Sequence, residues 1–191
     1  MDFNRIINGM IRAARLDKTF YEEVRHDTSY TQDALAVVVL VSFIGALGGL
    51  ISGLIFGSVG GAILGFIVQL IMGVVGYYLW VYIAHFVGTR FFKGAGEVGE
   101  VQRAFGFAYA PQALNILSAI PCAGVLVGIV AWIWSIAAGF IAIRQSLGQD
   151  DTNAALTVVV SAIVVFVIVA VVTGIFAAVG IGAAAIGGAF K

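Results

Sequence analysis

Long uncharged stretches dominate the pattern of hydrophobic and polar positions along this chain. With histidine counted as neutral, no charge interrupts residues 34–89, 104–143 or 152–190. A helix that crosses the hydrocarbon core of a bilayer needs about 20 apolar residues. The first two stretches are therefore each long enough for two crossings, divided by the glycine- and serine-containing run 57–61 and by the turn that follows Pro121.

The third stretch holds one good span, because its Val/Ile-rich part ends near residue 179 and the glycine-rich remainder is too short for another. The pattern predicts an all-α membrane bundle over residues 33–191. Its five spanning helices are expected at about residues 34–56, 62–87, 104–120, 123–143 and 155–179. Residues 1–32 form a separate polar segment that we expect to lie in the cytoplasm.

Composition supports a lipid environment. Hydrophobic residues make up 61% of the 191 positions, charged residues make up 10%, and the mean hydropathy is +1.07. A soluble domain has about a quarter charged residues, so this chain has too little charge to cover a water-facing surface. Its net charge of zero gives no electrostatic reason to expect nucleic-acid binding.

The segment before the first span has the pattern of an amphipathic helix. Its apolar positions recur at helical spacing: Phe3, Ile6, Ile7, Met10, Ile11 and Ala14. Arg5, Arg12 and Arg15 lie elsewhere on the helical wheel. This pattern predicts a helix in the headgroup region whose arginines contact anionic lipid. A helix packed on the cytoplasmic end of the bundle is the alternative.

The basic residues indicate the orientation. They precede the first span, lie between the second and third, and follow the fourth, whereas the loops after the first and third spans have no charge. Because Lys and Arg concentrate on the cytoplasmic side of a membrane, we expect the N-terminus inside and, with five spans, the C-terminus outside. Lys191 is the one charge on the far side.

Glycine recurs at every fourth position through the first span, at Gly45, Gly49, Gly53 and Gly57. Such a face lets another backbone approach closely, and helix association in lipid depends on this close packing. We expect the glycine face to pack against another helix of the same bundle, with a dimer face as the alternative.

Mild polar residues mark the third predicted span. Tyr109, Gln112 and Asn115 share a face, and Pro111 cannot donate a backbone hydrogen bond to Phe107. Together with Gln69 and His85 of the second span, these residues are candidates for lining a small polar cavity. Hydrogen bonding between helices is the other interpretation, at about 0.6 kcal/mol per contact.

Catalytic and metal-binding patterns are absent from the sequence. No Asp, Glu, Lys or Arg lies inside a predicted span, although such residues usually mark ion pathways. The chain has one cysteine and two separate histidines, and it contains no zinc-protease, nucleophile-elbow or phosphate-loop motif. We therefore expect no catalytic residue, no cofactor, no metal and no enzymatic activity.

Several short stretches occur in a recognisable order. They are HFVGTRFFKGAG at 85–96, EVQRA at 100–104, FAYAP at 107–111, IP at 120–121, WIW at 132–134, IRQ at 143–145 and TNA at 152–154. In this order the chain resembles the short prokaryotic form of the Yip1 family. The resemblance implies five spans, a cytoplasmic N-terminus and a place in the cell membrane. Eukaryotic members act in vesicle traffic with prenylated small GTPases, but this chain lacks their long N-terminal region and their Asp-Leu-Tyr-Gly-Pro motif.

Two functional hypotheses follow. The first is a non-enzymatic scaffold that organises membrane lipids, another copy of itself or other membrane proteins through its N-terminal helix and glycine face. The alternative is a transporter or channel for a small solute or a lipid, using the polar cavity around the third span.

Overall fold

The computed structural model describes residues 2–120 and 123–189, and the side chains of residues 2–117, 120 and 124–175. Every regular element in these ranges is a helix, and the ranges contain no strand. The elements in chain order are α1 (Phe3–Ala14), α2 (Lys18–His26), α3 (Tyr30–Phe56), α4 (Val59–Phe91), α5 (Val98–Ala108), the 3-10 helix η1 (Ala110–Ala119), α6 (Ala123–Leu147) and α7 (Asp151–Ala189).

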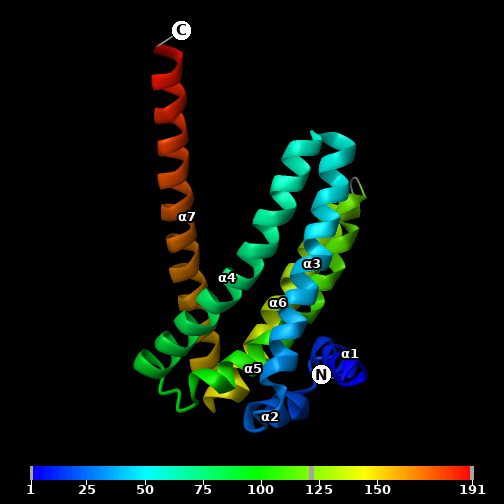
Figure 1. The fold of residues 1–191 in the computed structure, drawn as a ribbon. Coiled ribbons are helices and arrows are strands. Elements are labelled where there is room, and N and C mark those ends of the chain that lie inside the picture. The colour runs from blue at the N-terminus through cyan, green and yellow to red at the C-terminus, as the bar shows by residue number, and fades with distance from the viewer. Residues whose placement is uncertain (1, 121–122, 190–191) are drawn as a thin grey trace.

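The helices run back and forth along one direction (Figure 1). The starts of α3, α5 and α7 and the ends of α4 and α6 gather at one end of the molecule, next to α2. The described charged residues all belong to 2–33, 90–103 and 144–151, in these same segments. We call this part the charged end. The turn between α3 and α4 lies at the opposite end, and α7 runs toward that side apart from the other helices.

Within the described residues, four helices are long and apolar enough to cross a membrane: Tyr30–Phe56, Val59–Phe91, Gly124–Leu147 and Asp151–Ile175. They correspond to the first, second, fourth and fifth predicted spans. Helix α4 has 33 residues and α7 has 39, or about 50 and 58 Å of length. Both exceed a hydrocarbon core of about 30 Å, so they must tilt or project beyond it.

The third predicted span, 104–120, is not one helix. An α-helix ends at Ala108, and a 3-10 helix follows from Ala110 to Ala119 with Pro111 near its start. Proline has no N–H to donate, and it disfavours the α conformation in the residue before it. The sequence pattern located the apolar stretch but not the change of helix type within it.

The charged end contains a closely packed aromatic core. Phe20 of α2 and Phe107 of α5 are fully buried, and their ring centroids lie 5.0 Å apart in an edge-to-face arrangement. Tyr30 packs against both rings. Gly9 lets α1 approach them, because a Cβ there would lie 2.5 Å from Phe107 Cε1. The N-terminal helices are therefore packed into the bundle.

Buried and half-buried arginines hold α2 to the helices beside it. Arg103 of α5 donates from Nε to the carbonyl of Val24 over 3.0 Å and from a second nitrogen to the carbonyl of Arg25. These carbonyls lie in the last turn of α2, where they have no partner within the helix and where a positive charge is favourable. Arg25 in turn bonds Glu100 over 2.7 Å and the carbonyl of Gln145 over 2.8 Å.

Gln149 ties the end of α4 to the start of α7. Its amide nitrogen donates to the carbonyls of Gly88 and Phe92 over 3.2 and 2.9 Å, and Thr157 donates to its amide oxygen over 3.1 Å. Gly88 leaves room for this contact, because a Cβ there would lie 2.3 Å from Leu147 Cδ1 and 3.1 Å from Thr157 Cγ2. Two carbonyls at the end of α4 thus accept hydrogen bonds from a side chain of the loop between α6 and α7.

Packing becomes sparse away from the charged end. In α3, 44% of the most apolar 18-residue window is buried, against 33% in α6, 17% in α7 and 6% in α4. Helices α4 and α7 therefore present most of their apolar length to the surroundings of the chain.

Candidate functional site

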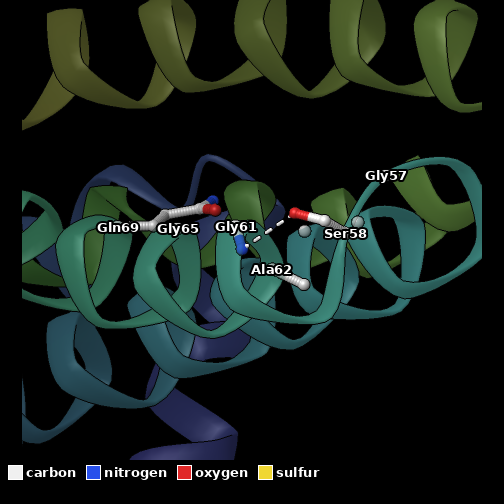
Figure 2. A pocket seen from close by; sticks show the side chains of 8 residues that line it. Gly57, Ser58, Gly61, Ala62, Gly65 and Gln69 are labelled. Atoms are coloured by element: carbon white, nitrogen blue, oxygen red, sulfur yellow. Dashed lines mark hydrogen bonds between the residues drawn. The ribbon is translucent and has the colours of Figure 1, made fainter.

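The first recess lies where α3 and α4 meet, at the end of the molecule away from the charged end (Figure 2). It has a volume of about 240 Å³ and is lined almost entirely by glycine and small residues: Gly49, Gly53, Gly57, Ser58, Gly61, Ala62, Gly65 and Gln69. We call it the glycine notch. Ser58 begins α4, where its hydroxyl oxygen accepts a hydrogen bond from the Gly61 N–H over 3.2 Å.

Glycines of the notch allow α3 and α4 to approach closely. A Cβ at Gly49 would lie 2.7 Å from Gln69 Oε1, and one at Gly53 would lie 2.9 Å from the Cβ of Ala62. Gly45 faces the same amide, with 3.5 Å from its added Cβ to Gln69 Nε2. The α3 glycines therefore pack against a helix of their own chain, whereas Gly65 of α4 has nothing within 4 Å.

With Ser58, Gln69 is one of two polar side chains of the notch. It is exposed, and it makes no side-chain hydrogen bond within the part of the chain that the structure describes. Figure 2 shows the amide running alongside α4 next to Gly65. Because an amide in the hydrocarbon region has no water to bond, it is satisfied best by a polar group of another helix.

The second recess is larger, at about 620 Å³, and lies between α4, α5 with η1, α6 and α7. We call it the lateral groove. Most of its lining is apolar: Trp80, Ala84, Phe105, Trp132, Ile136, Gly139, Ile143, Val158, Val159, Ala162, Ile163, Val165, Phe166 and Val169. Many of these side chains, including Trp132 and Phe166, are well exposed, so the groove opens sideways.

Three polar side chains interrupt the apolar lining of the groove: Tyr109, Gln112 and Ser135. We call them the polar trio. The Ser135 hydroxyl is buried and has no hydrogen-bond partner among the described residues. Ser135 follows Trp134, whose indole N–H donates over 2.7 Å to the carbonyl of Ala14 at the end of α1. Ser135 of the trio thus adjoins the residue that bonds the N-terminal helix.

The six residues predicted to share one polar cavity are not gathered together, which corrects that prediction. Tyr109 and Gln112 line the lateral groove, whereas Gln69 lines the glycine notch and Pro111 and Asn115 line neither. His85 is also elsewhere, with its Nε2 3.1 Å from the carbonyl oxygen of Gly96. The 3-10 geometry of η1 keeps Gln112 and Asn115, three residues apart, on one face of the segment. Of the two, only Gln112 lines the groove.

The three predicted membrane-surface arginines differ in their surroundings. Arg5 pairs with the buried Asp33, and its guanidinium lies 4.8 Å from the centroid of the Tyr30 ring. Arg12 bonds Asp17 over 2.8 Å and Glu23 over 2.9 Å. Arg15 is exposed and has no ion pair within the described ranges. Of the three, Arg15 is the most available for contact with a lipid headgroup.

Asp17 joins α1 to α2 as the N-cap of the second helix. Its carboxylate accepts hydrogen bonds from the Thr19 hydroxyl over 2.6 Å and from Arg12 over 2.8 Å. These bonds lower the pKa of Asp17 from 3.8 to about 2, and the bond from Thr19 makes the largest contribution.

Sequence reasoning missed the residues that hold the charged end together, Asp33, Arg103, Trp134 and Gln149. Each has its partner far along the chain, as with Trp134 and Ala14. Asp33, Arg103 and Gln149 lie near the ends of apolar stretches and Trp134 lies inside one, but their partners depend on how the helices are arranged. Within the described residues, no three His, Cys, Asp or Glu side chains come together to hold a metal ion.

A comparison with protein families identifies the chain. The family model of the Yip1 domain matches residues 16–174. The chain belongs to the Yip1 family. The searches of curated proteins and of solved structures gave no match.

The Yip1 domain contains both recesses. Its match begins after α1, takes in α2 to α6 and ends within α7 at Gly174. The glycine notch, between residues 49 and 69, and the lateral groove, between residues 80 and 169, therefore lie inside the Yip1 domain. The chain is thus a multi-helix membrane protein with a Yip1 domain. Both recesses lie among its apolar helices.

Proposed function

We propose that this Yip1 protein is a non-enzymatic membrane scaffold that pairs with a second copy of itself through the glycine notch. The observation that carries the proposal is Gln69, an exposed amide without a hydrogen-bond partner in the described structure, next to an open run of glycines on α4. Helix association in lipid uses these two features, close backbone approach at small residues and hydrogen bonds between helices.

The geometry of the notch suits a symmetric pair. Gly61 and Gly65 leave the α4 backbone open, and a Cβ at Gly65 would meet nothing within 4 Å. In a two-fold arrangement the same patch is used on both copies. Each Gln69 amide would then reach the glycine-lined backbone of the other copy, so both amides would gain partners together.

The low burial of α4 supports the same proposal. Only 6% of its most apolar window is buried within the chain, so a long surface is available for another helix. Lipid would cover an apolar surface equally well, and it is the amide and the glycines that favour a protein contact at this position.

We place the protein in the cytoplasmic membrane with the charged end inside the cell. Nine of the ten Lys and Arg residues precede residue 145 in segments of this end, and cytoplasmic loops carry the excess of positive residues. Helices α5 and η1 together would make the third of five crossings, which leaves the C-terminus outside. Lipid contact by Arg15 and the exposed side of α1 completes this proposed arrangement.

Crosslinking of single cysteines in native membranes tests the pairing. With Cys122→Ser as the background, Gly65→Cys should form a disulfide between copies under mild oxidation. Ile71→Cys is the matched control, because residue 71 lies on the same helix about 240° around it from residue 65 and is also exposed.

A disulfide-linked dimer at position 65 but not at 71 supports the proposal. Equal crosslinking at the two positions would mean random collision. No dimer at position 65, or a crosslink there only to a different protein, would show that the notch does not join two copies.

A transport function receives less support. The larger recess has a mostly apolar lining and contains only two of the six residues predicted for a polar pathway. Flux of a small polar solute through this groove stays a prediction from the sequence.

A further inference from the structure

The lateral groove is a second unfilled feature, independent of the proposed pairing. Its walls are α4, α6 and α7, which are long and apolar enough to span a membrane, and the broken segment α5–η1. Trp132 and Phe166 line the groove and are exposed. In a bilayer the groove is therefore open to the acyl chains around the protein.

The dimensions of the groove suit one lipid chain. The groove follows α7 from Val158 to Val169, a length of about 16 Å. Its volume of about 620 Å³ is within the range of cavities that hold one small ligand.

The polar trio places a hydrogen-bonding region on an otherwise apolar wall. Tyr109 and Gln112 can donate hydrogen bonds, and the Ser135 hydroxyl is buried without a partner among the described residues. Ser135 of the trio adjoins Trp134, which bonds the carbonyl of Ala14. Arg12 and Asp17, which flank Ala14 in the sequence, are charged and need the headgroup region or water. The trio thus lies near the depth of phospholipid ester groups.

We infer that the lateral groove is a binding site for one acyl chain of a membrane phospholipid. The chain lies along the apolar face of α7 between Val158 and Val169, and an ester carbonyl accepts hydrogen bonds from Tyr109 and Gln112 of the polar trio. This site involves no contact between copies, so it does not depend on the glycine notch.

Fluorescence quenching by phospholipids brominated on the acyl chain tests the site. Trp80 lines the groove, is half-buried and stacks on Phe105, with ring centroids 5.8 Å apart. In the full chain carrying Trp132→Phe and Trp134→Phe, Trp80 is the remaining tryptophan. Its emission in bilayers of brominated lipid should fall well below that in unbrominated lipid.

Filling the groove should remove this quenching. Ala162→Phe adds a ring on the groove face of α7, and Gly139→Leu fills the groove from α6, where an added Cβ would lie 3.3 Å from the Phe105 ring. Val167→Phe is the matched control on α7, because Val167 is exposed and does not line the groove. Circular dichroism of each variant verifies that the helices remain.

Loss of most of the quenching in either folded groove variant, with quenching retained in Val167→Phe, supports acyl-chain binding. If Trp80 is not quenched, the groove is closed or filled by protein, and the inference is wrong. Equal quenching in the groove variants and the control would mean that Trp80 senses surrounding lipid from outside the groove, which also overturns it.

Discussion

At the charged end, α1, α2 and α5 pack over the start of α3 and the lower part of α6, and Phe20 and Phe107 are fully buried. Towards the α3–α4 turn, α4 and α7 leave most of their apolar side chains uncovered, as Phe166 illustrates with 74% of its surface exposed. The chain thus combines a core resembling that of a soluble protein with spans that have few partners of their own.

The contrast follows from the two solvents. Burying an aromatic ring away from water is strongly favourable, and buried arginines must find carbonyls or carboxylates, as Arg103 and Arg25 do. Between helices in lipid this driving force is absent, and close packing needs small residues or hydrogen bonds. We therefore expect the charged end to determine stability and the spans to provide surfaces for binding.

The largest expected effect comes from truncating the same residue type in both regions. Phe107→Ala should lower the free energy of unfolding by about 3–5 kcal/mol, because the ring is fully buried between α1, α2 and α3. Phe166→Ala removes a ring that contacts lipid or the open groove, and should change stability by less than about 1 kcal/mol. Unfolding by denaturant in mixed micelles measures both values.

Equal losses in the two variants would contradict the contrast between the regions. A small loss in Phe107→Ala alone would show that the aromatic core of the charged end is not needed to hold the N-terminal helices. Protease sensitivity of residues 1–30 gives a second readout, since α1 and α2 should be released first.

The sequence was sufficient for the features that depend on local composition. Apolar length located the spans that became α3, α4, α6 and α7, and the order of short motifs indicated the Yip1 family, which the family model confirms. Pro111 signalled an irregular third segment, but a 3-10 helix of ten residues is uncommon enough that composition does not predict it.

Features that depend on the arrangement of helices were beyond the sequence. Gln69 and Gln112 look alike in an apolar stretch, yet one lines the glycine notch and the other the lateral groove. The same holds for Gln149, whose two carbonyl partners lie about 60 residues away, at Gly88 and Phe92.

A smaller effect is expected where α4 is tied to α7. Gln149→Leu leaves the Phe92 carbonyl without its donor, whereas the Gly88 carbonyl keeps the Phe92 and Gly94 N–H groups. The change should cost about 2 kcal/mol of unfolding free energy. Gln145→Leu is the control on α6, because the Gln145 side chain is half-buried and makes no hydrogen bond within the described ranges. Comparable losses of unfolding free energy in the two variants would mean that removing any buried amide side chain has this cost, and that the link between α4 and α7 contributes nothing specific.

The smallest effect concerns pH at the corner between α1 and α2. Because hydrogen bonds from Thr19 and Arg12 lower the pKa of Asp17 to about 2, its ionised form stabilises the folded state above the ordinary pKa of 3.8. That contribution is lost as the pH falls from about 4 toward 2, and partial exposure limits it to about 1 kcal/mol or less. Thermal unfolding of the wild type and Asp17→Asn should therefore differ at pH 6 and converge near pH 2. A constant difference would show that the carboxylate charge has no role.

Counting subunits of fluorescently labelled protein in dilute bilayers tests the central claim most directly. That claim is that the sparsely packed spans bind partners outside the chain, beginning with a second copy at the glycine notch. The wild type should bleach in two steps, whereas Gly65→Leu, which adds a side chain where a Cβ would meet nothing within 4 Å, should bleach in one. Single-step bleaching of the wild type at every protein density, or two steps in the Gly65→Leu variant, would contradict it.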